Sequence, residues 1–207
     1  MKKLLHIIAT PRGDESRTLA VAGAFLEAFK TGHPGWTVEE LDLSKEDLPS
    51  LTLKRVDGKY VLLSGKDLSG DLEEAWKEIV RHIERFMSAD GYLISTPMWN
   101  FSVPYTLKHY IDVIIQPKYL FRYTAAGAEG LVKNKKMVVV ASRGGDYSSP
   151  ETRAADFQEP YLRAIFGLCG IKDMTFVTAQ PMDMGPELQK QKIGEAQQAA
   201  RLAATKF

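Results

Sequence analysis

The chain has 207 residues, of which 44% are hydrophobic and 26% are charged, as is ordinary for a soluble globular protein. This length predicts one domain over residues 1–207 that can bury a sizeable core. The formal net charge of +1 leaves no charge excess for a nucleic acid or a membrane surface, and no apolar run approaches the roughly 18 residues of a transmembrane helix.

A short apolar strand is predicted from Leu4 to Ala9, because a nearly continuous hydrophobic run is typical of a strand buried on both faces of a parallel sheet. A polar loop follows, and then a helix whose apolar stripe consists of Leu19, Ala22, Leu26 and Phe29. A strand, a loop and a helix in this order offer a phosphate free N–H groups and the positive end of a helix dipole.

The loop itself is rich in hydroxyl groups, which would add hydrogen bonds to a bound phosphate. It carries Thr10, Ser16 and Thr18, with Arg12 or Arg17 nearby as a countercharge. Neither a dinucleotide fingerprint nor a P-loop is present, so a single phosphate ester fits better than a di- or triphosphate. The alternative is that Ser16 only caps the helix.

A second strand is predicted from Trp36 to Leu41, after a glycine break. Residues 44–70 form a long irregular segment with Pro49 and several glycines, of which the part from Tyr60 to Leu63 has some ordered character. Loops of this length usually act as lids, binding loops or dimer contacts. A helix is expected from Asp71, with Glu74 as a capping-box partner and a core stripe that includes Trp76.

The most informative stretch follows the buried run from Gly91 to Ile94 and reads Pro97, Met98, Trp99, Asn100, Phe101. A helix pattern restarts near Pro104, so this segment lies at the carboxyl end of a strand and before a helix, where open α/β sheets bind ligands. Two aromatic faces around an amide would suit a flat ring with polar edges. The alternative is a loop that buries Trp99 and Phe101 in the core.

Alternating aromatic residues at Tyr119, Phe121 and Tyr123 predict a short strand or hairpin arm, and Gly127 and Gly130 are read as turn positions. The clearest buried strand runs from Met137 to Ala141. It ends in Ser142, Arg143, Gly144 and Gly145, whose glycines allow a ligand to approach the backbone closely.

A further helix over residues 160–168, a strand over residues 175–179 and a last helix from Pro186 complete the alternation of strands and helices. This alternation predicts a doubly wound α/β fold with a five-stranded parallel sheet in the flavodoxin-like order 2-1-3-4-5. Three strand ends carry candidate ligand loops, one suited to a phosphate and two to a flat heterocycle. Together they predict an FMN site at the switch point of the sheet.

Several motifs resemble the FMN-dependent NADH-azoreductases, which are flavodoxin-like NAD(P)H:quinone oxidoreductases, some long labelled acyl-carrier-protein phosphodiesterases. The resemblance is carried by residues 97–101 with Pro104, by residues 121–124 with Gly127 and Gly130, and by residues 142–145. It implies that Thr10, Ser16, Arg17 and Thr18 hold the phosphate. It also implies that Pro97, Met98, Trp99, Asn100, Phe101, Ser142, Arg143, Gly144 and Gly145 line the isoalloxazine ring.

Some positions depart from the family pattern: Thr10 stands where serine is usual and Trp99 where tyrosine is common. Residues 44–70 match the family little. The resemblance implies a homodimer, and the aromatic face at residues 119–123 favours one as well.

The function expected is a two-electron transfer from NADH or NADPH to quinones or azo compounds by a ping-pong mechanism. The bound FMN carries the chemistry, so no catalytic side chain is predicted. The alternative is a flavodoxin-type electron carrier, although such carriers are usually strongly acidic.

A hydrolase is disfavoured, because there is no G-x-S-x-G motif and the four histidines have no metal-ligand spacing. No metal site is therefore expected. The single cysteine, Cys169, lies in an apolar stretch that predicts a buried thiol, and it fits a reducing, cytoplasmic compartment. No signal peptide is read at the N-terminus.

Overall fold

A parallel sheet of five strands forms the centre of the computed structural model, which describes residues 1–207. The strands lie in the order β2-β1-β3-β6-β7. Every neighbouring pair is parallel, so all five carboxyl ends meet at one edge of the sheet. The strand bounds are β1 Lys2–Ile8, β2 Trp36–Asp42, β3 Gly91–Pro97, β6 Lys136–Ser142 and β7 Asp173–Ala179.

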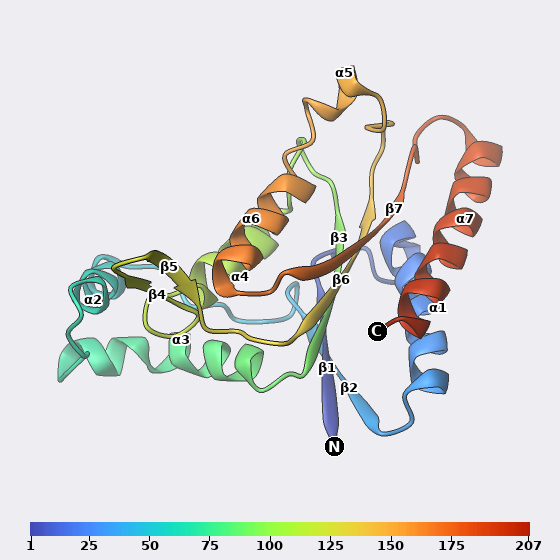
Figure 1. Ribbon diagram of the computed structural model, residues 1–207. Helices are drawn as coiled ribbons and strands as arrows, with labels where there is room; N and C mark the ends of the chain where they lie inside the picture. The colour runs from blue at the N-terminus through green and yellow to red at the C-terminus, as the bar shows by residue number, and fades with distance from the viewer.

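Helices cover both faces of this sheet, with α1 and α7 on one side and α3, α4 and α6 on the other (Figure 1). A single 3-10 turn, η1, precedes α1, and the short helix α5 lies beyond the carboxyl edge of the sheet (Figure 1). The helix bounds are α1 Arg17–Gly32, α2 Leu53–Leu63, α3 Asp71–Met87, α4 Tyr105–Ile114, α5 Pro150–Arg153, α6 Glu159–Cys169 and α7 Pro186–Thr205, with η1 at Gly13–Glu15.

The sheet separates two hydrophobic cores, because successive side chains of a strand point to opposite faces. In β1, Leu5 and Ile7 pack with α3, α4 and α6, whereas Leu4 packs with α1 and α7. On α1 the buried positions include Val21 and Phe25, while the predicted stripe residue Leu26 is only partly buried. The apolar runs of the strands thus serve both cores at once, as expected for a doubly wound sheet.

The strand order corresponds to the predicted pattern once the strands of the main sheet are counted alone. The strand numbers differ because two further strands lie between β3 and β6 in the sequence. These are β4 Phe121–Thr124 and β5 Gly127–Gly130, which form a separate antiparallel hairpin. The predicted hairpin arm is confirmed as β4, and Gly127 closes the turn at residues 125–126 as predicted. Gly130 instead ends β5, so its reading as a turn position is wrong. Of the predicted aromatic face, Phe121 is buried and Tyr119 is partly buried against the core, so only Tyr123 is well exposed.

The prediction of an irregular segment over residues 44–70 is wrong for residues 53–63, because α2 occupies Leu53–Leu63. The order expected from Tyr60 to Leu63 is confirmed, since these residues form the end of that helix. The misleading signal was the set of glycines in this segment, which includes Gly58. In the structure Gly58 packs directly on the indole of Trp76, and a Cβ at this position would overlap the ring. The indole N–H also donates to the carbonyl of Arg55 at 2.9 Å. The glycine is therefore a close-contact position between α2 and α3.

The helix α3 begins at Asp71 as predicted, but its capping differs from the prediction. Its N-cap is Gly70, which has no side chain to accept a hydrogen bond, and the carboxylate of Glu74 pairs with Lys77. No capping box is formed. The core role predicted for Trp76 is confirmed, since this side chain is fully buried.

Candidate functional site

A cavity of about 250 Å³ opens at the carboxyl edge of the sheet, where the loops after β1, β3 and β6 meet. These three strands are neighbours, so segments far apart in sequence gather there. Ten of the predicted site residues line the cavity: Thr10, Ser16, Arg17, Thr18, Pro97, Met98, Trp99, Ser142, Arg143 and Gly144. The other three, Asn100, Phe101 and Gly145, do not line it.

One end of the cavity is the N-terminus of α1. The hydroxyl of Ser16 accepts a hydrogen bond from the N–H of Leu19 at 3.3 Å, so the helix-capping role is confirmed. Capping leaves other first-turn N–H groups without a helical partner, and they carry the positive end of the dipole. The cap and an anion site are therefore compatible at this helix end.

The two other α1 residues at this end make contacts within the chain. The hydroxyl of Thr18 is buried and lies 2.6 Å from the hydroxyl of Ser142, so it joins the first turn of α1 to the end of β6. The guanidinium of Arg17 donates to the carboxylate of Asp183 at 2.5 Å and to the carbonyl of Met182 at 3.1 Å. The structure thus uses Thr18 and Arg17 to fix the cavity wall.

The loop after β3 is a tight two-residue turn. Trp99 and Ser102 exchange both backbone hydrogen bonds at 2.9 Å, and the two residues between them have positive φ, 48° at Asn100 and 67° at Phe101. These features define a type I′ turn, which is costly for a residue as bulky as phenylalanine. Trp99 is 38% exposed and Phe101 52% exposed, so the alternative that both rings are buried is wrong.

The loop after β6 leaves two backbone donors free, since the N–H groups of Gly144 and Gly145 have no acceptor within the chain. Gly144 also lies so close to Asp183 that a Cβ would overlap the carboxylate. These features fit a ligand that accepts hydrogen bonds along one edge and approaches the backbone closely. The amide of Asn100 likewise has no partner within the chain.

Arg143 lines the cavity, but its charged group is directed to a partner within the chain. Its guanidinium is buried and forms an ion pair with Asp156 at 3.0 Å, with only 4% and 7% of the two side chains exposed. Its backbone N–H and carbonyl are bonded to Ala179 and Met182. The arginine therefore supports the loop, and its charge is already balanced by a buried carboxylate.

Three consecutive residues before and at the start of α6 were not identified from the sequence: Asp156, Phe157 and Gln158. They hold the loops after β3 and β6, which we call the ring-side loops. Asp156 pairs with Arg143, and the N–H of Phe157 donates to the carbonyl of Phe101 at 3.0 Å. Gln158 is fully buried. Its amide donates to the carbonyl of Pro97 at 2.9 Å and accepts from Arg143 Nε at 3.2 Å. We call residues 156–158 the loop clamp.

Met182 and Asp183 also line the cavity and were missed. They follow β7, whose carboxyl end lies beside that of β6, so the rule that found the other loops also applies here. The loop carries no hydroxyl group, aromatic ring or glycine pair to mark it in the sequence.

Titratable groups outside the cavity supply no nucleophile. Burial raises the pKa of the Cys169 thiol to about 12, so the prediction of an inert buried cysteine is confirmed. Burial lowers the pKa of His6 to about 4, against a smaller opposing effect of Asp42, and this ring lies 2.8 Å from the hydroxyl of Ser95. Neither residue lines the cavity. No helix of the protein is both long and apolar enough to span a bilayer.

The donor set of the cavity fits a flavin mononucleotide. Hydroxyls, first-turn N–H groups and the guanidinium of Arg12 lie at the α1 end, where a phosphate needs donors and positive charge. The free N–H groups of Gly144 and Gly145 and the partly exposed ring of Trp99 lie at the other loops, where a flat ring needs edge donors and an aromatic face.

Comparison with known proteins agrees with this architecture. A family model described as flavodoxin-like fold matches residues 2–203. An FMN-dependent NADH:quinone oxidoreductase of Nitratidesulfovibrio vulgaris is 39% identical over 209 residues, covering 100% of both chains. A protein of the same name from Ruegeria pomeroyi is 41% identical over 183 residues, which are 87% of this chain and 90% of the relative.

Two solved structures are similar over nearly the whole chain. An azoreductase from Bacillus anthracis has a TM-score of 0.90 and 29% identity, covering 100% of both chains. An FMN-dependent NADH-azoreductase from the same species, solved in complex with FMN, has a TM-score of 0.84 and 28% identity, covering 99% of this chain and 100% of the other.

Proposed function

Because the chain belongs to the flavodoxin-like family that includes FMN-dependent NADH:quinone oxidoreductases, we propose that it is an enzyme of that kind. It binds FMN and transfers electrons from NADH or NADPH to quinones or azo compounds. The observation that carries the proposal is the cavity at three adjacent strand ends, which combines an anion-binding helix terminus with free edge donors. When bound, FMN would supply the two-electron redox chemistry.

The chain's own residues bind and orient the cofactor in this proposal. Ser16, Thr10 and the α1 terminus hold the phosphate, and Arg17 is fixed beside it by Asp183. The free N–H groups of Gly144 and Gly145 donate to the ring edge, with the free amide of Asn100 at the neighbouring turn. Directed donors of this kind favour negative charge on a bound ring.

The overall reactions balance without a further reactant. NADH, a proton and a quinone give NAD⁺ and a quinol, while an azo compound needs two NADH and two protons to give two amines. Donor and acceptor are proposed to occupy the same open cavity in turn, which is a ping-pong mechanism. Initial rates at several fixed acceptor concentrations should then give parallel double-reciprocal lines.

We further propose that the protein acts as a cytoplasmic homodimer. Several large aromatic side chains near the carboxyl edge of the sheet are exposed, and this supports the proposal, since apolar surface of this kind is often covered by a partner. The rings belong to Trp99, Phe101, Tyr105 and Phe157, and the hairpin residue Tyr123 is exposed as well. Sedimentation at micromolar concentration should give the mass of a dimer, and a monomer would contradict the proposal.

The decisive experiment is a visible spectrum of the purified protein, followed by anaerobic addition of NADH and then benzoquinone. We expect the flavin band to disappear with NADH and to return with the quinone. A flavin that NADH and NADPH both fail to reduce, while a one-electron donor succeeds, would support the alternative of an electron carrier. Absence of flavin binding would contradict both functions.

A further inference from the structure

A second cavity, of about 460 Å³, lies beside the first and is not accounted for by FMN binding. The two cavities share the side chains of Thr10 and Trp99, so they are neighbours at the same edge of the sheet. The second cavity is built by the segment after β2 and by the first turns of α4. The apolar and ring-containing side chains that line it include Leu43, Leu48, Trp99, Tyr105 and His109.

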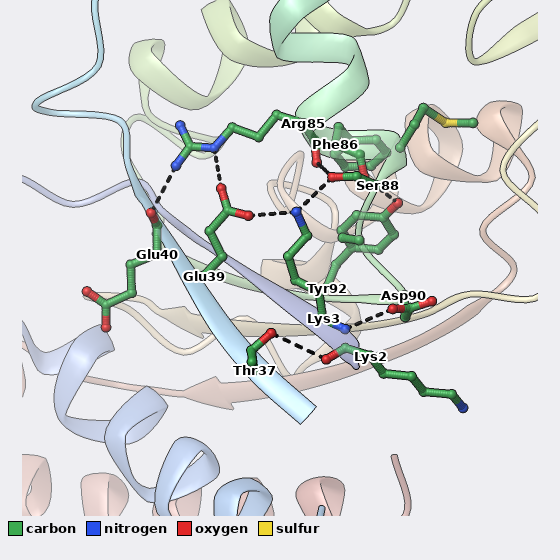
Figure 2. Close-up of polar contacts among 12 residues, drawn as sticks. Lys2, Lys3, Thr37, Glu39, Glu40, Arg85, Phe86, Ser88, Asp90 and Tyr92 are labelled. Carbon is green, nitrogen blue, oxygen red and sulfur yellow. Dashed lines mark hydrogen bonds and ion pairs between the residues drawn. The ribbon is translucent and has the colours of Figure 1, made fainter. Parts of the chain in front are cut away.

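The wall of this cavity is held in place from two sides. On one side Arg85 of α3 donates to the carboxylate of Glu46 at 2.7 Å and to that of Glu39 at 2.6 Å. Figure 2 shows Arg85 reaching from α3 to Glu39 and to the backbone of Glu40 in β2. On the other side His109 Nε2 lies 3.1 Å from the carbonyl of Pro49. A wall fixed in this way forms the cavity before any ligand binds.

The charge of the second cavity is opposite to that of the first. Its lining holds two carboxylates, Glu46 and Asp47, and no lysine or arginine. Arg85 balances Glu46, whereas Asp47 is exposed and makes no ion pair. The first cavity instead holds three guanidinium groups, Arg12, Arg17 and Arg143, against one carboxylate, Asp183, which pairs with Arg17. Anionic groups are therefore attracted to the first cavity and repelled from the second.

We propose that the second cavity binds the distal aromatic ring of a two-ring electron acceptor and favours neutral or cationic rings over sulfonated or carboxylated ones. This inference rests on the proposed function, because the acceptor's other ring must reach the first cavity. Trp99 lies between the two cavities and offers its face to the bridging part of such an acceptor. Asp47 is the group that discriminates by charge.

The test compares two azo compounds that differ only in the distal ring, one carrying a trimethylammonium group and the other a sulfonate. The readout is the ratio of their kcat/KM values with the FMN-loaded protein. A single uncompensated charge at about 6 Å in a solvated site changes binding by a factor of about three to five. Removing the carboxylate weakens binding of the ammonium compound by that factor and strengthens binding of the sulfonate by the same factor. We therefore expect Asp47→Asn to lower the ratio by about 10-fold to 25-fold and Asp47→Lys to reverse the preference.

Glu187→Lys is the matched control, because Glu187 is an exposed carboxylate on α7 that lines neither cavity and makes no ion pair. It changes the net charge as Asp47→Lys does, and it should leave the ratio unchanged. A ratio that Asp47→Lys leaves unaltered, or that Glu187→Lys alters equally, would overturn the inference.

Benzoquinone separates this inference from the proposed function, since it has one ring and no distal group. If the unsubstituted protein does not reduce benzoquinone, the proposed function fails. If it reduces benzoquinone and shows no dependence on the distal charge, only the second-cavity inference fails.

Discussion

Replacing Gln158 by leucine tests whether the loop clamp positions the two ring-side loops. The buried Gln158 amide satisfies the carbonyl of Pro97 and Nε of Arg143, and leucine removes both hydrogen bonds while keeping an apolar side chain of similar size. The carbonyl of Pro97 keeps a hydrogen bond from the hydroxyl of Thr96 at 3.2 Å, so Arg143 Nε is the group left without a partner. An orphaned buried polar group costs about 1 to 3 kcal/mol, and more when it is charged, as the guanidinium is. Because burying leucine recovers part of this, we expect a net loss of about 3 kcal/mol.

The loss should be visible in both stability and flavin affinity. For a chain of this length, about 3 kcal/mol lowers the Tm by roughly 6 to 12 °C. Loops that no longer hold their arrangement also bind FMN less often, and each 1.4 kcal/mol raises the apparent Kd about tenfold. We therefore expect the Kd measured by flavin fluorescence to rise about tenfold to a hundredfold in Gln158→Leu.

Gln197→Leu is the control for this experiment. Gln197 donates one partly exposed hydrogen bond, to the carbonyl of Ala20 at 3.0 Å, and it does not line the cavity. Its replacement should change stability by no more than about 0.5 kcal/mol. A folded Gln158→Leu protein with the FMN affinity of the unsubstituted chain would refute the positioning role, whatever happened to its Tm.

Three further predictions concern groups outside the cavity. Burial lowers the pKa of His6 to about 4, so its neutral form contributes stability that is fully present above pH 6.5. This contribution, about 3 kcal/mol, is lost as the pH falls from 6.5 toward 4. In urea unfolding, His6→Gln should therefore make the free energy of unfolding less dependent on pH over this range. Gly58→Ala should cost about 1 to 3 kcal/mol, because the new methyl overlaps Trp76, and an unchanged unfolding midpoint would count against that contact. Cys169 should resist alkylation by iodoacetamide at pH 8 in the folded protein and react after denaturation, since burial raises its pKa to about 12.

Much of the architecture follows from local pattern. Continuous apolar runs such as Leu4 to Ala9 and Met137 to Ala141 identify buried parallel strands, because both faces of such a strand meet helices. The carboxyl ends of parallel strands share one edge, so polar and glycine-rich segments that follow them converge. This is why ten predicted site residues line one cavity although they span positions 10 to 144.

What each of those residues does was decided by tertiary contacts. Arg143 is directed to Asp156, and Thr18 is directed to Ser142, since a buried polar group takes the partner that the fold brings within reach. Residues 156–158 carry no motif, and their role arises only because α6 begins beside the loops after β3 and β6.

The helix α2 shows most clearly that local sequence does not reveal tertiary contacts. Its sequence contains Gly58, which by local propensity weakens a helix, yet the residue is required where α2 meets the ring of Trp76. Local sequence determines which backbone conformations are low in free energy, and so it determined the strands, most helices and the position of the site. Which side chains meet across the sheet depends on packing between distant segments, and only the tertiary structure decides it.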